Sequence, residues 1–202
     1  MTDPDAYFAY LTRRSRLGMI YRRYWLYPRL IGQLEGRVLD IGCGIGDFLA
    51  FRPGTIGVDI NPRLVDWCKQ RGLDAHAMPV DRLPFEDASF DGAVLDNVLE
   101  HIADPAPLLA EAKRVLRPDG TLLIGVPGRR GYAADPDHKV FYDADLLVET
   151  LGAAGFARGR LFAMPLPWGW LDRIIPQYCL YGTFAAAGAD GKAERVAKGV
   201  LS

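Results

Sequence analysis

The chain has 202 residues, of which 50% are hydrophobic and 24% are charged, as in an ordinary globular protein. This length suffices for one domain with a hydrophobic core, and no repeat or low-complexity tract argues for a second domain. The formal net charge of -1 at pH 7 provides no overall positive field, so the composition argues against a nucleic-acid partner.

The three cysteines stand at positions 43, 68 and 179. They form neither the even set of a disulfide framework nor a Cys-x-x-Cys metal pair, so we expect a cytoplasmic protein without a metal site. The first residues lack the continuous apolar core of a signal peptide, and no stretch approaches the roughly 18 apolar residues of a spanning helix. Contact with the inner face of a membrane stays open.

The first 35 residues differ in composition from the rest of the chain. Residues 6–34 contain no acid but are rich in arginine and aromatic residues, namely Arg13, Arg14, Arg16, Arg22, Arg23, Arg29, Tyr7, Phe8, Tyr10, Tyr21, Tyr24, Trp25 and Tyr27. We interpret residues 1–35 as a basic, aromatic and mostly helical arm and residues 36–202 as the main domain.

From residue 36 onward, short β-rich apolar runs alternate with helical stretches, which is typical of βαβ units around a parallel sheet. We expect strands at residues 37–41, 55–58, 73–78, 91–95, 121–126, 156–164 and 179–184. We expect helices at residues 47–51, 62–71, 105–116 and 143–151. A Pro/Trp-rich insertion at residues 165–178 interrupts this alternation.

A glycine-rich loop, Asp40-Ile-Gly-Cys-Gly-Ile-Gly46, follows the first expected strand. Glycine in such a turn lets backbone N–H groups approach a ligand closely. Asp47 occupies the place of the third glycine in a dinucleotide fingerprint, and no Gly-Lys-Ser/Thr follows as in a P-loop. Because the loop begins with the carboxylate of Asp40, it favours a cationic ligand over a phosphate.

A second acid, Asp59, ends the second expected strand. A carboxylate at this position can accept hydrogen bonds from both hydroxyls of an unphosphorylated ribose, while Asp40 can attract an ammonium group. Viewed singly, each acid could equally cap the helix that follows it. Their joint placement at consecutive strand ends favours a nucleoside that carries an amino acid.

Five segments in sequence carry a resemblance to a known family: Val38-Leu-Asp-Ile-Gly-Cys-Gly-Ile-Gly-Asp-Phe48, Gly57-Val-Asp59, Leu83-Pro-Phe-Glu-Asp-Ala-Ser-Phe-Asp91, Val98-Leu-Glu-His-Ile102 and Glu111-Ala-Lys-Arg-Val-Leu-Arg-Pro-Asp-Gly-Thr-Leu122. They resemble class I S-adenosylmethionine-dependent methyltransferases, in particular the small-molecule and glycan-modifying group with a Leu-Pro-Phe loop. The resemblance covers residues 36–163. It implies an α/β fold with a Rossmann-like, seven-stranded, mostly parallel sheet, helices on both faces and an antiparallel last strand.

The resemblance also implies S-adenosylmethionine as cofactor and S-adenosylhomocysteine as product. The residues implied to hold the cofactor are Asp40, Gly42, Cys43, Gly44, Asp59, Ile60, Val80, Asp81 and Asn97. The Cys43 side chain itself is interpreted as a small loop filler. Where the family frequently has an Asp-Ala pair this chain has Pro79-Val80, so the backbone N–H of Val80 and the carboxylate of Asp81 are the remaining candidates for adenine recognition.

Methyl transfer from a sulfonium is an in-line displacement that needs a base only when the acceptor is a hydroxyl. His138 is the leading base candidate because it lies in a polar loop after the fifth expected strand. Its alternative role is to stabilise this loop by pairing with Asp135 or Asp137. His76 is interpreted as a surface residue. His101 follows the fourth expected strand at the rim of the pocket and is interpreted as a packed, hydrogen-bonded helix residue.

Two other residues are candidates for acceptor or donor placement. Asn97 would hold the donor or the acceptor at the rim of the pocket. Tyr142 would orient the acceptor or simply pack in the interior. No metal ligand is predicted.

Because the core of the domain binds the cofactor, we expect the arm, the His138 loop and the insertion to select the acceptor. Arginine and tyrosine side chains suit a sugar or phosphate-bearing acceptor, and the insertion offers an apolar surface for a lipid-linked acceptor or a membrane. A lid, a dimer contact or a solvated arginine face would explain the same features, so a monomer and a homodimer both stay open.

Three functions follow from these regions. The first is O-methylation of a sugar or glycan precursor, free or lipid-linked. The alternatives are N-methylation of a small amine or phospholipid head group, and a non-catalytic cofactor-binding scaffold.

Overall fold

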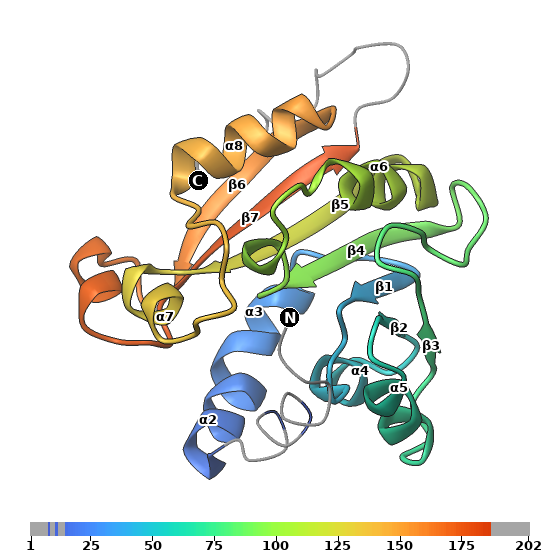
Figure 1. Cartoon of the computed structure of the whole chain (residues 1–202), viewed down its shortest axis with the longest axis horizontal. Helices are drawn as coiled ribbons and strands as arrows, with labels where there is room; N and C mark the ends of the chain where they lie inside the picture. The colour runs from blue at the N-terminus through green and yellow to red at the C-terminus, as the bar shows by residue number, and fades with distance from the viewer. Residues whose placement is uncertain (1–7, 9–10, 12–14, 187–202) are drawn as a thin grey trace.

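A computed structural model of the protein describes residues 8, 11 and 15–186. The other residues of the predicted arm and the tail after residue 186 lie outside the described part. Within it, one seven-stranded sheet has the order β3-β2-β1-β4-β5-β7-β6 (Figure 1). The strands are β1 (Val38–Ile41), β2 (Ile56–Asp59), β3 (Ala75–Ala77), β4 (Phe90–Asp96), β5 (Leu116–Pro127), β6 (Phe156–Met164) and β7 (Cys179–Ala186).

Strand direction confirms the predicted fold class. The pairs from β3 through β5 are parallel, whereas β7 runs antiparallel to both of its neighbours, β5 and β6. The sheet is therefore Rossmann-like, with an antiparallel last strand inserted between β5 and β6.

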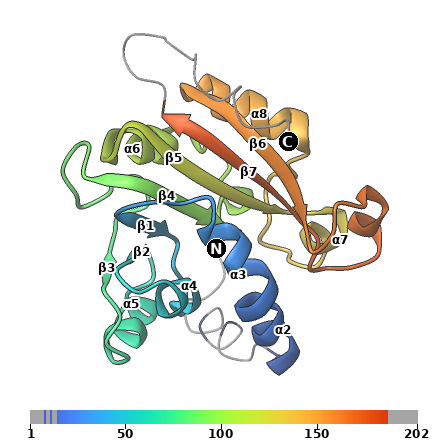
Figure 2. The ribbon, with the colours of Figure 1, turned by 180° about the vertical axis from the view of Figure 1, so that it is seen from behind.

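Helices cover both faces of the sheet (Figures 1 and 2). In chain order they are α2 (Arg16–Tyr21), η1 (Arg22–Leu26), α3 (Tyr27–Ile31), α4 (Asp47–Phe51), α5 (Pro62–Lys69), η2 (Leu99–His101), α6 (Ala106–Val115), α7 (Arg129–Ala133), α8 (Ala144–Ala153) and η3 (Gly169–Arg173). Side chains of α6 and α8 build one hydrophobic cluster, and side chains of α3 and α4 build another.

The central strands supply alternate residues to the two clusters, as the two-residue period of a strand requires. On β4, Ala93 and Leu95 belong to the cluster with α6, and Val94 between them belongs to the cluster with α3. All three are nearly inaccessible to solvent. A continuous apolar strand is thus buried on both of its faces.

Local sequence signals set several element ends where they were expected. Asn61 accepts a hydrogen bond from the Arg63 backbone N–H at 3.0 Å and caps α5, with Pro62 in the first turn. Asp143 caps α8 by accepting from the Leu146 N–H at 2.9 Å. Gly155 follows α8 with a φ of +79°, which is the left-handed conformation that glycine tolerates at a helix end.

The fifth strand differs from its prediction, because β5 begins at Leu116 and not at Thr121. Leu116 pairs with Phe90, and the next register pair is Thr121 with Gly92. The turn between them contains Asp119 with a φ of 64°. It therefore interrupts one strand as a bulge, and does not precede a new strand.

The second half of the predicted arm is part of the hydrophobic core. Leu26, Leu30 and Leu34 are buried in the cluster that contains Val94 and Leu123 of the central strands. Leu26 and Leu30 are four residues apart and lie on one side of the helical segment, and Leu34 follows its end. The arm therefore covers one face of the sheet. Its earlier helical turns, before Leu26, lie beside the carboxyl ends of the central strands.

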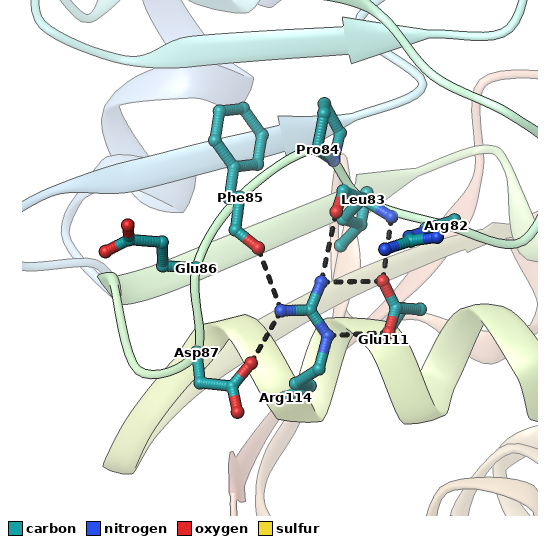
Figure 3. Close-up of a pocket in the computed structure, with 8 residues that line it drawn as sticks. All are labelled: Arg82, Leu83, Pro84, Phe85, Glu86, Asp87, Glu111 and Arg114. Atoms are coloured by element: carbon teal, nitrogen blue, oxygen red, sulfur yellow. Dashed lines mark hydrogen bonds and ion pairs between the residues drawn. The ribbon is translucent and has the colours of Figure 1, made fainter.

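The Leu-Pro-Phe segment is held against α6 by Arg114, as Figure 3 shows. The Arg114 guanidinium donates to the carbonyl oxygens of Leu83 at 3.0 Å and Phe85 at 2.8 Å. It also bonds to both carboxylate oxygens of Glu111, at 2.6 Å and 2.7 Å, and to Asp87 at 2.7 Å. Glu111 in turn accepts from the Leu83 backbone N–H at 2.8 Å.

This network explains why the family segments around Leu83 and Glu111 occur together. One planar guanidinium satisfies two backbone carbonyls and two carboxylates in a fixed geometry. The hollow that these residues line belongs to a structural anchor, on the loop between β3 and β4.

We expect Arg114→Ala to lower the free energy of unfolding by about 2 kcal/mol, because it removes several charge-assisted hydrogen bonds and leaves their partners unpaired. Urea unfolding monitored by circular dichroism measures the change. Arg158→Ala is the control, since Arg158 lies exposed on β6. Equal stability of the two variants would contradict an anchoring role.

Candidate active site

A cavity of about 520 Å³ lies at the carboxyl ends of the central strands, within the size range of small-molecule sites. The chain leaves β1 for β2 on one side and returns to β4 on the other. Loops that diverge from such a switch point leave a crevice between them. The walls come from the loop after β1, the ends of β4 and β5, the arm helices, the loop after α7 and the start of β7. Figures 1 and 2 show α2 and α7 at this end of the sheet.

The glycine-rich loop forms one wall of this cavity and is folded back onto β2. The backbone N–H groups of Gly42 and Cys43 donate to the Val58 carbonyl at 2.8 Å and 3.0 Å. Gly42 has a φ of +78°, and a Cβ there would lie 2.5 Å from a methyl carbon of Val98. Only glycine fits this position, so the backbone itself lines the cavity.

The Cys43 side chain packs away from the ligand space. Its thiol belongs to a small buried cluster that also contains Leu49, Val65 and Cys68. This confirms the interpretation of the side chain as a filler, while the residue as a whole borders the cavity.

Asp40 gives the loop side of the cavity its acidic character. Its side chain is almost completely buried, at 4% exposure. Burial raises the pKa of Asp40 well above its ordinary value, and the nearby carboxylates of Asp96, Asp59 and Asp47 raise it further. A buried carboxylate among others is costly in its ionised form unless a cation compensates it. This wall is therefore suited to a positively charged ligand.

Asp59 lies directly beneath the loop. One carboxylate oxygen accepts from the Gly44 N–H at 2.9 Å, and the other accepts from the Asn61 N–H at 2.8 Å. Burial raises the pKa of Asp59, although these backbone hydrogen bonds oppose the effect. Asp59 thus joins the ends of β1 and β2, and its carboxylate retains lone pairs for further donors.

Three of the residues predicted to hold the cofactor are exposed outside the cavity wall. Ile60 and Val80 are 56% and 66% exposed, and Asp81 is exposed as well. Ile60 follows β2, and the other two follow β3. Because β2 and β3 are adjacent and parallel, with Asp59 opposite Ala77, these segments leave neighbouring strand ends.

An ion pair at the end of β4 brings the arm into the site. Nη1 of Arg22 lies 3.9 Å from Oδ2 of Asp96. Oδ1 of Asp96 accepts from the Tyr181 hydroxyl at 2.8 Å and from the Asn97 side-chain amide at 2.9 Å. Arg22 begins η1, a five-residue π-helical segment, a feature frequent at functional sites.

The sequence did not single out Arg22 or Asp96. Two sequence features could have indicated them: the absence of acids from the arm, and the position of Asp96 beside Asn97. Asn97 itself borders the cavity, as predicted, and has a φ of 57°. This left-handed conformation is uncommon for a residue with a side chain and often marks a functional site.

Glu100, His101 and His138 meet on the other side of the cavity. The Glu100 carbonyl accepts hydrogen bonds from the backbone N–H groups of Lys139 at 2.7 Å and Val140 at 3.1 Å. These bonds hold the His138 loop against η2. The His101 and His138 rings are 4.6 Å apart between centroids, and both line the cavity.

His101 lies in a short 3-10 helix at the cavity wall, in agreement with its expected place at the rim of the pocket. Burial lowers the pKa of His101, and the neighbouring His138 lowers it further. Both effects favour the neutral ring.

The orientation of His138 is fixed through its Nδ1, which lies 2.8 Å from the Tyr132 carbonyl oxygen. Since a carbonyl only accepts, Nδ1 carries the hydrogen and Nε2 of the neutral ring has a free lone pair. Nε2 lies 3.8 Å from Oε1 of Glu100 and 4.0 Å from Oδ2 of Asp135. The ring also stacks on Tyr132.

Glu100 is fully buried, and among the described residues neither carboxylate oxygen has a hydrogen-bond partner. Burial raises the pKa of Glu100 to about 8, and the nearby Asp96 and Asp135 contribute in the same direction. Glu100 is absent from the sequence-based candidates, although it adjoins His101 in the family segment.

Tyr142 does not border the cavity. Its side chain is 4% exposed and belongs to the main hydrophobic cluster. The structure thus shows the packing that was the alternative role of Tyr142. His76 is a surface residue as predicted, with Nε2 2.8 Å from the Asp74 carboxylate.

Known proteins share the sequence and the fold of this chain. A family model described as a methyltransferase domain matches residues 39–124. A protein of Mycolicibacterium smegmatis, named a probable S-adenosylmethionine-dependent methyltransferase, is 33% identical over 179 residues, covering 77% of this chain and 70% of the relative. The chain belongs to the S-adenosylmethionine-dependent methyltransferases. S-adenosylmethionine is accordingly its cofactor.

Two further proteins resemble this chain, one in sequence and one in fold. A Mycobacterium ulcerans protein, named a probable phthiotriol/phenolphthiotriol dimycocerosates methyltransferase, is 40% identical over 109 residues, covering 47% of this chain and 42% of the relative. A Thermotoga maritima structure, titled a possible histamine N-methyltransferase, has a TM-score of 0.70 at 21% identity, covering 89% of this chain and 98% of that one. Of two other curated relatives, the methyltransferase chain spans 33% and 65% of their length.

The methyltransferase also lacks, within its described residues, any helix with the length and hydropathy that crossing a bilayer requires.

We expect Glu100 to make the methyltransferase less stable as the pH rises. The folded-state pKa of about 8 lies above the ordinary 4.5, so the stability present below the lower value is lost as the pH passes through the higher one. Each unit of difference is worth about 1.4 kcal/mol, which gives a loss on the order of a few kcal/mol.

Urea unfolding at about pH 5 and about pH 9, with a chelator present, measures this loss. Glu100→Gln should lose less stability over the same interval than the wild type does. Glu149→Gln, on the exposed side of α8, is the matched control and should behave as the wild type. A Glu100→Gln protein with the full wild-type pH dependence would refute the assignment.

Proposed function

We propose that this methyltransferase transfers its methyl group to a hydroxyl of a sugar or glycan precursor, free or lipid-linked. The supporting observation is the oriented Nε2 lone pair of His138 in the cavity wall. A hydroxyl must lose a proton as it attacks the sulfonium methyl group, whereas a neutral amine need not lose one before attack. His138 is therefore the candidate base.

In this arrangement the donor occupies the acidic wall. The methionine part lies along Asp40, Gly42 and Gly44, where the buried carboxylate favours the ammonium and sulfonium charges. The ribose reaches Asp59, and the adenine extends over the exposed segments around Ile60 and Val80, with Asp81 near its amino group. Asn97 then lies between donor and acceptor.

The acceptor enters between the arm and the insertion. Ser15 and Tyr21 of the arm region and Gln177 of the insertion side line the same cavity, beside Arg22. These polar and aromatic groups suit sugar hydroxyls and faces. The Trp25 indole N–H donates to the Pro165 carbonyl at 2.9 Å and ties the two segments together.

A lipid portion could extend over the neighbouring surface. Trp168 and Trp170 stack with ring centroids 6.2 Å apart, and they are 52% and 59% exposed. Exposed aromatic surface of this kind favours contact with apolar matter. The Mycobacterium ulcerans relative, whose name specifies a triol and its lipid esters as substrates, supports a hydroxyl on a lipid.

N-methylation of a small amine or phospholipid head group is the second candidate function. Asp135 and Glu100 lie beside His138, and carboxylates favour a cationic amine. The two candidates differ in their need for a base.

For the donor, we expect Asp40→Asn and Asp59→Ala each to weaken S-adenosylmethionine binding by about 10- to 100-fold, because each variant removes a charge-assisted contact. Wild-type affinity should fall as the pH is lowered through the raised pKa of Asp40, since the protonated acid no longer attracts a cation. Calorimetry measures both effects. Asp66→Asn, exposed on α5, is the control.

Unchanged binding in Asp40→Asn and Asp59→Ala would contradict the donor placement. Absence of binding to the wild type would overturn the assignment of S-adenosylmethionine to this cavity.

For the acceptor, we expect His138→Ala to lower turnover on a hydroxyl substrate by about 100- to 10,000-fold. The variant should also lose the limb of the pH–rate profile that requires a deprotonated group. Methyl transfer from labelled S-adenosylmethionine to panels of sugar phosphates, lipid-linked glycans and amines measures this. Activity confined to amines and unaffected by His138→Ala would favour the second candidate function.

A further inference from the structure

We propose that Glu100, His101 and His138 bind a divalent transition-metal ion at the acceptor side of the cavity. Each residue offers one ligand atom, and these atoms lie within 4.8 Å of one another. Metal binding itself is independent of the acceptor, whereas the catalytic role assigned to the metal below rests on the proposed function.

The backbone already brings the three ligands together. Glu100 and His101 are consecutive in η2, and the hydrogen bonds from Lys139 and Val140 to the Glu100 carbonyl attach the His138 loop to the same helix. Metal–ligand distances of about 2.1 Å require donor atoms roughly 3 to 4 Å apart. Small side-chain rotations therefore suffice to form the site.

The buried carboxylate of Glu100 points to a cation independently of this spacing. Neither oxygen has a partner among the described residues, although such a group is costly to bury unpaired. His138 cannot supply a donor in its neutral form, because Nδ1 carries the hydrogen and faces the Tyr132 carbonyl. Lone pairs of Glu100 and His138 thus converge at 3.8 Å, an arrangement that a shared cation stabilises.

The ligand set indicates the class of metal. Two imidazole nitrogens and one carboxylate are typical of Zn²⁺, Mn²⁺, Fe²⁺ or Co²⁺, whereas Ca²⁺ and Mg²⁺ prefer oxygen ligands alone. Three protein ligands leave coordination positions for an external oxygen, as in catalytic metal sites. Both histidines line the cavity, so these positions face the space proposed for the acceptor.

A bound metal changes how the acceptor loses its proton. His138 Nε2 becomes a ligand, and the metal lowers the pKa of a coordinated hydroxyl, so that the proton leaves to water or to the Asp135 carboxylate. The oxygen then forms a bond to the methyl carbon as the carbon–sulfur bond breaks and its electron pair returns to sulfur. The products are a methyl ether and the neutral thioether.

Calorimetric titration of the full, chelator-treated chain with Mn²⁺ tests the proposal. Mn²⁺ is the first probe because it favours nitrogen and oxygen donors, which avoids binding by the thiols of Cys43 and Cys68. We expect one site per chain. Glu100→Gln, His101→Ala and His138→Ala should each weaken binding at least tenfold, and His76→Ala, at the surface, should not change it.

Replacement of the probe by Co²⁺ provides a spectroscopic readout. A visible absorption spectrum typical of nitrogen and oxygen ligands should appear with the wild type and with His76→Ala and be lost in His138→Ala. No Mn²⁺ binding to the wild type, or equal binding to all four variants, would overturn the metal site. Circular dichroism of each variant confirms that a loss of binding is not a loss of folding.

Failure of the metal site is distinguishable from failure of the proposed function. Hydroxyl methylation that persists in chelator but is abolished by His138→Ala would overturn the metal role and retain His138 as base. Stoichiometric Mn²⁺ binding combined with methyl transfer only to amines would support the metal site and overturn O-methylation. Hydroxyl methylation that is lost in chelator and restored by Mn²⁺ supports the metal site and O-methylation together, with His138 as a ligand and not as the base.

Discussion

Negative charge at the ends of the two central strands is the constraint on which the site depends. Asp40 and Asp96 lie near the carboxyl ends of β1 and β4, adjacent parallel strands whose apolar residues are buried on both faces. Such carboxylates repel each other and lose hydration together, and both effects oppose ionisation. The folded protein can keep these carboxylates ionised only if cations or hydrogen-bond donors lie at the same strand ends.

The two acids are compensated differently. Asp96 receives the Tyr181 hydroxyl and the Asn97 amide and lies 3.9 Å from the Arg22 guanidinium. No such set of donors reaches Asp40 from the described residues, and burial together with the nearby acids raises its pKa. The uncompensated acid is thus the one that faces the glycine-rich loop, where a cofactor with ammonium and sulfonium charges would complete the balance.

The arm connects this electrostatic balance to the hydrophobic core. Leu26, Leu30 and Leu34 anchor it against the sheet, and the π-helical segment η1 places Arg22 over the strand ends one turn earlier. One continuous helical segment therefore provides packing at its end and a cavity wall at its beginning. Truncating the arm would remove part of the core as well as a contact for the acceptor.

The helices and strands that the sequence predicted correctly are those indicated by short-range patterns. Strand periodicity, the cap at Asn61 and the glycine after α8 act over a few residues, and the elements they indicate are present. The pair Arg22–Asp96 joins residues far apart in the sequence, so no local pattern indicates it. Backbone bonds from Lys139 and Val140 to Glu100 fix the His138 loop at the cavity, and Tyr142 beyond this loop packs in the core. No local pattern decides between these two places.

The charge of the donor changes during the reaction, and this change affects how tightly the acidic wall of the cavity holds the cofactor. S-adenosylmethionine brings a sulfonium to the acidic wall, and methyl transfer converts this sulfonium into a neutral thioether. In the proposed arrangement the product therefore loses part of the attraction that held the substrate near Asp40, while its ammonium group retains the rest. Because the carboxylate is buried, this difference is larger than it would be in water. In this arrangement the charge that selects the donor also favours release of the spent cofactor.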